Sequence, residues 1–341
     1  MTPAIFGIAG PVLSDDERTF FRDADPAGYI LFARNCETRE QLRRLTDDLR
    51  SLHGRDRLIV SIDQEGGRVA RMKPPEWPRF PAGEAFAQLY DLAPASAIEA
   101  ALVNAEALAR ELADCGITVN FHAPLDVRRP ETDDVIGDRA LGGSPMQVAA
   151  LGRAILEGHA RADVVGCLKH IPGHGRATCD SHKVLPRVNA SEAELEDDIA
   201  PFRTLAAHPL GMSAHIVFEA WDNERPATLS PVVIEDIVRG RIGFDGLLLT
   251  DDIDMQALDG TIPERAERAL AAGCDVVLNC WARLDDMLGI ATRCPDLDEA
   301  GQARLERVHA AMGNASNGGA STAALIAKRD ALLGLAISSE A

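Results

Sequence analysis

The chain has 341 residues, 46% of them hydrophobic, and a formal net charge of −18. This length can bury one large core, so we expect a single catalytic domain over residues 1–341 with a polar C-terminal tail that frays. The negative charge argues against nucleic acid as a partner, because nucleic-acid binders need a basic surface.

No signal peptide and no apolar run of about 18 residues are visible, so we expect a soluble, cytoplasmic protein with no membrane partner. The 7 cysteines lack the paired short spacings of a zinc site or a disulfide framework, which suits a reducing compartment. We expect the protein to be a monomer.

Short β-rich runs alternate with amphipathic helical stretches along the chain, which predicts a parallel sheet. Eight such runs with continuous spacing favour a closed TIM-type (β/α)8 barrel over a doubly wound sheet. The predicted strands are Ile5–Ala9, Gly28–Ala33, Leu58–Asp63, Ile117–Pro124, Val164–Lys169, Leu210–Ile216, Gly246–Asp251 and Asp275–Cys280.

Helix signals fill the gaps between these runs. Leucines at 42, 45, 49 and 52 form one helical face that stops at Gly54, and an alanine-rich helix runs from Ile98 to Leu112. Ser-Pro pairs at 144–145 and 230–231 mark helix starts, and a capping box joins residues 191 and 194. After residue 280 the chain is mostly helical, with a Gly/Asn/Ser-rich break at 313–319.

The segment 169–175 reads KHIPGHG and is followed by DSH at 180–182, which concentrates three histidines, a lysine and a carboxylate. It follows the apolar run 164–168, so Lys169 and His170 are expected to leave the carboxyl end of a buried strand. Pro172 and the glycines forbid a helix there, which predicts a mobile loop bearing histidines.

Polar residues follow several other predicted strands, as expected for the mouth of a barrel, where active sites form. Each position alone has a plainer explanation: Asp126 as an organiser of its loop, Asn279 as a turn former. Their repetition favours one shared site. These positions are Asp63, Asp126, Lys169, His170, His215, Asp251 and Asn279.

Taken together, these motifs resemble those of the bacterial β-N-acetylglucosaminidases of glycoside hydrolase family three. The resemblance spans residues 5 to about 285 and rests on KHIPGHG at 169–175, DSH at 180–182, DQEGGR at 63–68, IGDR at 136–139 and TDD at 250–252. Ile171 stands where the family usually has phenylalanine, and Ile253-Asp254 replaces the more usual Leu-Ser.

The resemblance implies a TIM barrel that removes terminal β-linked N-acetylglucosamine by retaining, exo-acting hydrolysis. It further implies a cytoplasmic role in peptidoglycan recycling, with N-acetylglucosaminyl-anhydromuramyl fragments as the small-molecule glycan substrate. Neither a metal nor a cofactor is implied, and DQEGGR lacks the spacing of a phosphate-binding loop.

Residue roles follow from the same comparison and from the chemistry of retaining hydrolysis, which needs a nucleophile and an acid. Asp251, at the end of a buried strand, is the expected nucleophile, although it also suits the N-cap of a following helix. The family assigns the acid/base role to an Asp-x-His dyad, here Asp180 and His182. An isolated DSH would otherwise be an ordinary solvated turn.

The sugar-binding positions of the family fall on Asp63, Arg71, Arg139, Lys169 and His170. For both arginines a structural ion pair with Glu65 or Asp138 is the alternative. His174 and His215 are expected to shape the loop and the rim. Only 4% of residues are aromatic, so a short terminal pocket is expected rather than a stacking track.

Three other interpretations stay open at this point. His170, His174, Asp180, His182, His215 and Asp251 could form a metal site, although Pro172-Gly173 breaks the helical spacing that two of the ligands would need. A histidine acid also suits a phosphorylase, since it repels phosphate less than a carboxylate does. The third is a catalytically silent sugar-binding barrel.

Overall fold

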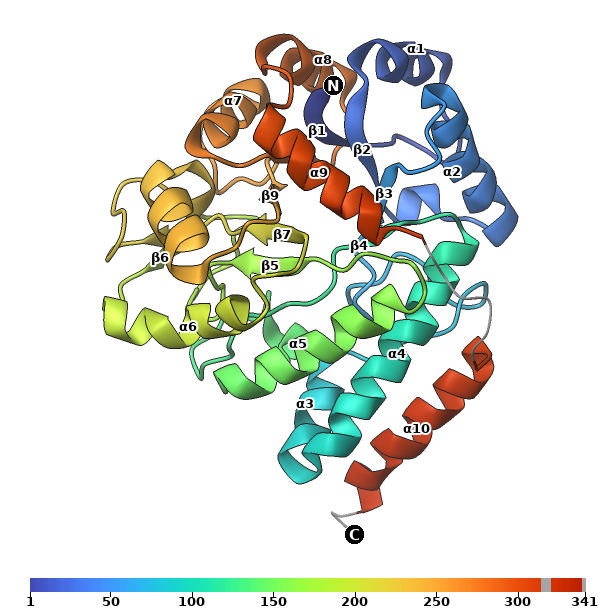
Figure 1. The fold of residues 1–341 in the computed structure, drawn as a ribbon, viewed down its shortest axis with the longest axis vertical. Coiled ribbons are helices and arrows are strands. Elements are labelled where there is room, and N and C mark those ends of the chain that lie inside the picture. The colour runs from blue at the N-terminus through green and yellow to red at the C-terminus, as the bar shows by residue number, and fades with distance from the viewer. Residues whose placement is uncertain (314–319, 339–341) are drawn as a thin grey trace.

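A parallel sheet of eight strands forms the centre of the molecule (Figure 1). The computed structural model describes residues 1–313 and 320–338. Each predicted run contributes one strand: β1 (Thr2–Gly7), β2 (Pro26–Leu31), β3 (Ile59–Ile62), β4 (Val119–Asn120), β5 (Leu168–Ile171), β7 (Leu210–Ser213), β9 (Leu247–Asp252) and β10 (Val276–Asn279). The order across the sheet is β4-β3-β2-β1-β10-β9-β7-β5.

The two edge strands, β4 and β5, meet and close the sheet into a barrel. Parallel bridges join Val119 to Val165 and Pro124 to Lys169. The Asn120 amide donates to the Val165 carbonyl at 2.9 Å, and the Leu125 amide donates to the Lys169 carbonyl at 2.6 Å. The predicted TIM-type barrel is confirmed.

Strand β5 starts and ends later than predicted. The apolar run 164–167 bridges β4 only locally, and the ladder with β7 begins where Leu168 faces Gly211. Lys169 and His170 therefore lie within the strand, which ends before Pro172, a residue that cannot donate to a ladder. Their side chains are held by a strand rather than by a loop, although the register with β7 shifts between Leu168 and Ile171.

A second sheet was not predicted from the sequence. Strands β6 (Arg187–Val188) and β8 (Val217–Phe218) pair in parallel outside the barrel. Two-residue strands carry no measurable alternation, so the hydrophobic pattern gives no signal for them.

The helices surround the barrel, and the predicted capping signals are used. Gly54 ends α2 in the left-handed conformation, Ser144 caps α5, and the capping box of residues 191 and 194 starts α6. Helix α4 begins at Pro94, four residues before the predicted start. The helices are α1 (Asp15–Ala24), α2 (Arg39–His53), α3 (Gly83–Leu92), α4 (Pro94–Asp114), α5 (Pro145–Ala160), α6 (Glu192–Thr204), α7 (Ile262–Ala272), α8 (Leu284–Arg293), α9 (Glu299–Ala311) and α10 (Thr322–Ser338).

Shorter helical elements complete the fold. Three turns of 3-10 helix are η1 (Ala33–Asn35), η2 (Gly137–Arg139) and η3 (Ala227–Leu229), and η4 (Val233–Ile242) is a π-helix that follows the predicted start at Ser230-Pro231. No helix within 1–313 or 320–338 is long and apolar enough to cross a membrane. Most of the predicted break at 313–319, and the end of the tail predicted to fray, lie outside the described residues.

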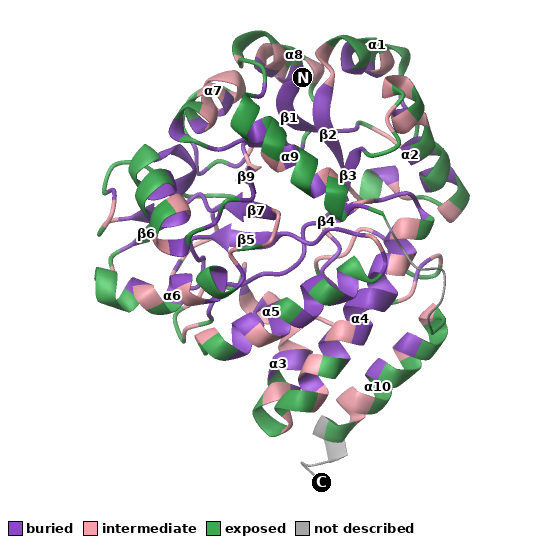
Figure 2. Ribbon diagram, in the orientation of Figure 1, coloured by how far each residue is buried: buried purple, intermediate pink, exposed green. Residues whose placement is uncertain are grey.

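Helix α9 closes the amino-terminal end of the barrel. Its Leu305 and Val308 belong to the same hydrophobic cluster as Ile5, Ile30 and Ile59 of the strands. In Figure 2 the strands are buried, and the outer faces of the surrounding helices are exposed. With this end closed by a helix, a substrate has access only at the carboxyl ends of the strands.

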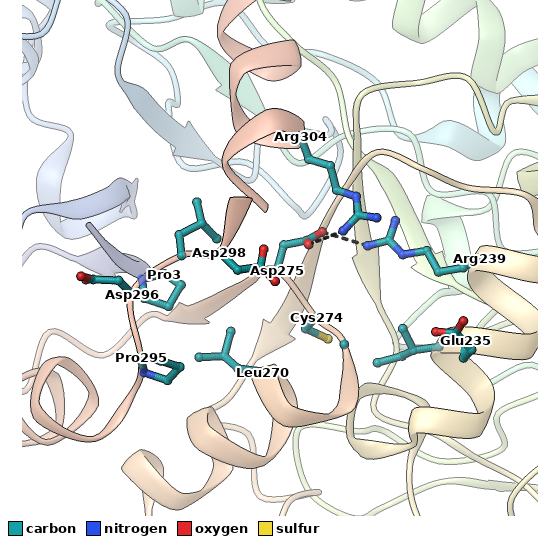
Figure 3. Close-up of a pocket in the computed structure, with 13 residues that line it drawn as sticks. Pro3, Glu235, Arg239, Leu270, Cys274, Asp275, Pro295, Asp296, Asp298 and Arg304 are labelled. Carbon is teal, nitrogen blue, oxygen red and sulfur yellow. Dashed lines mark hydrogen bonds and ion pairs between the residues drawn. The ribbon is translucent and has the colours of Figure 1, made fainter. Parts of the chain in front are cut away.

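A cavity of about 270 Å³ lies beside this closed end, and Figure 3 shows its lining. Asp275, which precedes β10, forms ion pairs of 2.8 Å with both Arg239 and Arg304. It also accepts the Leu248 amide of β9 at 2.8 Å. Asp275 thus joins η4 and α9 to the barrel through its two ion pairs.

Replacing Asp275 with Asn is expected to lower the free energy of unfolding by about 3 kcal/mol, because the largely buried Arg239 loses its counter-charge and Arg304 keeps only the exposed Asp245. Denaturant unfolding measures the loss. The matched control is Asp296→Asn at an exposed ion pair with the N-terminus, where no measurable loss is expected. Equal stability of the two variants would contradict the structural role of Asp275.

Candidate active site

A cavity of about 220 Å³ opens at the carboxyl ends of the strands. The predicted catalytic and sugar-binding residues all line it except Asp180, which contacts the lining residue His182. The lining consists of Phe32, Asp63, Arg68, Val69, Arg71, Val135, Arg139, Lys169, His170, His182, Met212, Asp251, Asp252, Leu278 and Cys280.

Asp251 lies near the end of β9 and is held by its own backbone. The Asp252 amide donates to Asp251 Oδ1 at 2.8 Å. Burial would raise the pKa of Asp251, but the imidazoles of His170 and His215 and this amide outweigh it and lower the pKa to about 2. Asp251 is therefore an ionised carboxylate facing the cavity across the neutral pH range.

His182 approaches the cavity from a connection that leaves β5, and its side chain is 62% exposed. Its Nδ1 donates to Asp180 Oδ1 at 2.8 Å, and its backbone amide donates to the same oxygen at 2.9 Å. Burial would raise the pKa of Asp180, but these two donors lower it. The bond at Nδ1 leaves Nε2 of His182 available to a ligand.

The connection that carries His182 is anchored at several points. Ser181 is buried, and its Oγ lies 3.2 Å from His174 Nε2. The His182 carbonyl accepts the Gln256 amide at 3.4 Å from the segment after β9. His174 thus shapes this loop, as expected.

Asp126 is fully buried and orders the start of the same loop. Its Oδ2 accepts from His170 Nδ1 at 2.8 Å, and its Oδ1 accepts the His174 amide at 2.7 Å. Burial would raise the pKa of Asp126, but the contacts with His170 and His174 lower it. Because Asp126 holds Nδ1, Nε2 of His170 points the other way, where it lies 3.5 Å from Arg139 Nη2 of the cavity lining.

Glu65 holds together two cations from different parts of the barrel. It accepts from Arg139 with both oxygens, at 2.9 and 2.8 Å, and from Lys169 Nζ at 2.7 Å. Burial would raise the pKa of Glu65, but Arg139 and Lys169 lower it far below its usual value. The structural ion pair weighed for Arg139 is present, yet the guanidinium still lines the cavity.

Arg71 and Arg68 take other partners at the rim. Arg71 lies 3.4 Å from Asp63, whose other oxygen is 3.2 Å from Lys169 Nζ. Arg68, a lining residue that sequence reasoning did not single out, binds Asp138 at 2.7 Å and backbone carbonyls of the adjacent loop. Arg71 therefore pairs with neither of the partners considered for it.

Two further polar residues at strand ends make hydrogen bonds within the protein. His215 Nε2 donates to the Asp252 carbonyl at 3.0 Å, and Asn279 Nδ2 donates to Asp254 at 2.8 Å. Neither lines the cavity. Among the residues that the structure describes, no group of three or more His, Cys, Asp or Glu side chains is arranged to hold a metal ion.

The sequence reasoning missed the apolar floor of the cavity. Met212, Leu278 and Cys280 continue the hydrophobic interior of the barrel up to the polar rim, and Phe32 lies at the side beneath the Arg71 guanidinium. Alternation along the strands could have indicated them: Leu278 and Cys280 are two residues apart on one face of the last predicted strand.

Comparisons with known proteins agree with this geometry. The model of the family described as "Glycosyl hydrolase family 3 N terminal domain" matches residues 10–312. A β-hexosaminidase of Alkalilimnicola ehrlichii is 38% identical over 90% of this chain and 88% of its own length, and one of Chromobacterium violaceum is 39% identical over 90% and 86%.

Solved structures give the same result. NagZ from Neisseria gonorrhoeae, in complex with N-trifluoroacetyl-D-glucosamine, superposes with a TM-score of 0.85 at 34% identity over 98% of both chains. A family 3 β-N-acetylglucosaminidase from Paenibacillus superposes with a TM-score of 0.86 at 30% identity over 98% of this chain and 66% of its own. The chain belongs to glycoside hydrolase family three.

Proposed function

We propose that this enzyme is an exo-acting β-N-acetylglucosaminidase, which releases single terminal β-linked N-acetylglucosamine units with retention of configuration. One observation carries the proposal: a small cavity combines the half-buried carboxylate of Asp251 with the exposed imidazole of His182, which Asp180 holds. A retaining hydrolase needs such a nucleophile and such a proton donor. The relatives named β-hexosaminidase and β-N-acetylglucosaminidase support the choice of sugar.

The charged groups of the rim bind the terminal sugar. Lys169 and Arg139 donate to hydroxyl or acetamido oxygens, Asp63 accepts from hydroxyls, and Arg71 and His170 complete the set. Charged partners make stronger hydrogen bonds than neutral ones. Glu65 keeps both of its cations ionised and in place, so the sugar meets a site that is already organised.

In the first step the Asp251 carboxylate attacks the anomeric carbon and the glycosidic bond breaks. The departing oxygen takes a proton from the His182 imidazolium, and a glycosyl ester forms on Asp251. Asp180 orients the imidazole by accepting a hydrogen bond from Nδ1.

In the second step His182, now neutral, takes a proton from water, and the water oxygen attacks the anomeric carbon. The ester bond breaks, which regenerates the Asp251 carboxylate and the imidazolium. Two inversions at the same carbon give net retention. The scheme needs neither a metal nor a cofactor.

The cellular substrate that we propose is a small N-acetylglucosaminyl-anhydromuramyl fragment of peptidoglycan, processed in the cytoplasm by a monomeric enzyme. The small volume of the cavity favours a single terminal sugar over the interior of a long glycan. The strongly negative charge keeps the enzyme away from nucleic acid and anionic membrane surfaces.

Product analysis tests the function directly. With a chromogenic β-N-acetylglucosaminide, the expected product is free N-acetylglucosamine at the same rate with and without phosphate, and a β-glucoside reacts far more slowly. A site built to hydrogen-bond the acetamido group leaves its own polar atoms unpaired when that group is absent. Sugar 1-phosphate would identify a phosphorylase instead, and binding without turnover would identify a silent sugar-binding barrel.

Asp251→Asn should lower kcat by about 10³-fold or more, because the amide keeps the size of the side chain but is no nucleophile. The Kd of N-acetylglucosamine should change little. Burst kinetics and binding are measured on the folded variant, with Asp285→Asn at an exposed position of α8 as the control. Near-normal turnover in Asp251→Asn would remove the residue from this role.

His182→Ala should lower kcat/KM for a disaccharide by about 10²- to 10⁴-fold and for a nitrophenyl glycoside much less, because an acid matters in proportion to the basicity of the leaving oxygen. Asp180→Ala should show the same pattern more weakly. Val184→Ala, at an exposed residue of the same loop, is the control. Equal losses on both substrates would make His182 structural.

A further inference from the structure

Asp254 joins the segment after β9 to the end of β10, although the scheme above gives it no role. Its Oδ2 accepts three N–H donors: Asn279 Nδ2 at 2.8 Å, the Cys280 amide at 2.9 Å and the Trp281 amide at 3.2 Å. One of these residues, Cys280, lines the cavity. Asp254 also stands where the family usually has serine, whose single hydroxyl cannot supply the negative charge that these three donors receive from a carboxylate.

Asp252 connects Asp254 to the same network. Its Oδ1 accepts the amides of Asp254 at 3.1 Å and Cys280 at 3.3 Å. The side chain of Asp252 therefore also ties the segment after β9 to the end of β10. Burial and the neighbouring Asp254 carboxyl raise the pKa of Asp252 far above its usual value.

Residue 252 in turn orients Asp251. Its amide donates to Asp251 Oδ1 at 2.8 Å, and its carbonyl accepts from His215 Nε2 at 3.0 Å. The backbone of Asp252 is thus fixed by Asp251 and His215, and its side chain is fixed by Asp254 and Cys280. A displacement of the side chain would move the amide that holds Asp251.

We propose that Asp254 is a positioning residue for the reaction: it clamps residues 252–254 to residues 279–281, and so fixes the amide that orients Asp251. The inference rests on the proposed function in taking Asp251 as the nucleophile. Asp254 acts through Asp252 and does not touch the sugar.

The kinetic test compares Asp254→Ala, Asp254→Asn and Asp285→Asn in the full chain on a chromogenic N-acetylglucosaminide. Asp254→Ala should lower kcat about 10- to 100-fold with the Kd of N-acetylglucosamine changed less than about threefold, because a misplaced nucleophile slows chemistry more than binding. Asp254→Asn should recover most of kcat, since its amide oxygen accepts the same donors. Unchanged kcat in Asp254→Ala, or equal losses in kcat and binding, would overturn the proposal.

These outcomes are distinct from a failure of the proposed function. An active Asp251→Asn enzyme would exclude Asp251 as the nucleophile, whatever the Asp254 variants show. Asp285→Asn, at an exposed position of α8, should keep the native kcat and Kd.

Discussion

The site depends on the buried ion network in which Glu65 binds Arg139 and Lys169. These residues come from three separate parts of the chain: the segment after β3, the end of η2 and strand β5. A buried charge without a partner is strongly destabilising, so each member requires the others. The network thereby fixes the β3 loop against β5, beside the strand pair that closes the barrel, and leaves two cations directed at the cavity.

The two proposed catalytic residues differ in their setting: Asp251 lies on a rigid strand, and His182 lies on an exposed connection. Asp251 is held inside a six-residue strand, and its low pKa keeps it ionised. His182 lies on a connection, largely exposed, and is tied to the barrel through Ser181 and the Gln256 amide. A nucleophile benefits from fixed geometry. An acid that must serve first the leaving group and then water benefits from access to solvent.

Much of the fold could be predicted because the barrel strands are buried on both faces and read as apolar runs. The bounds of β5 could not, since the run at 164–167 looks like a strand although the ladder begins only at Leu168. Glu65 and Lys169 are more than a hundred residues apart in the sequence, and sequence periodicity does not indicate contacts over such a separation. Asp254 looked like a minor departure next to the motif, and only the backbone of residues 279–281 shows what it holds.

The distribution of charge around β9 explains how one end of the barrel can hold so many carboxylates. Asp63 and Glu65 are neutralised by Lys169 and the arginines, and Asp126 by contacts with two histidines. Asp251, Asp252 and Asp254 have no lysine or arginine ion pair among the described residues. Asp251 depends instead on the imidazoles of His170 and His215 and on the Asp252 amide, which together lower its pKa to about 2. Asp252 and Asp254 accept N–H groups from the end of β10, so the same segment binds that strand while Asp251 remains ionised.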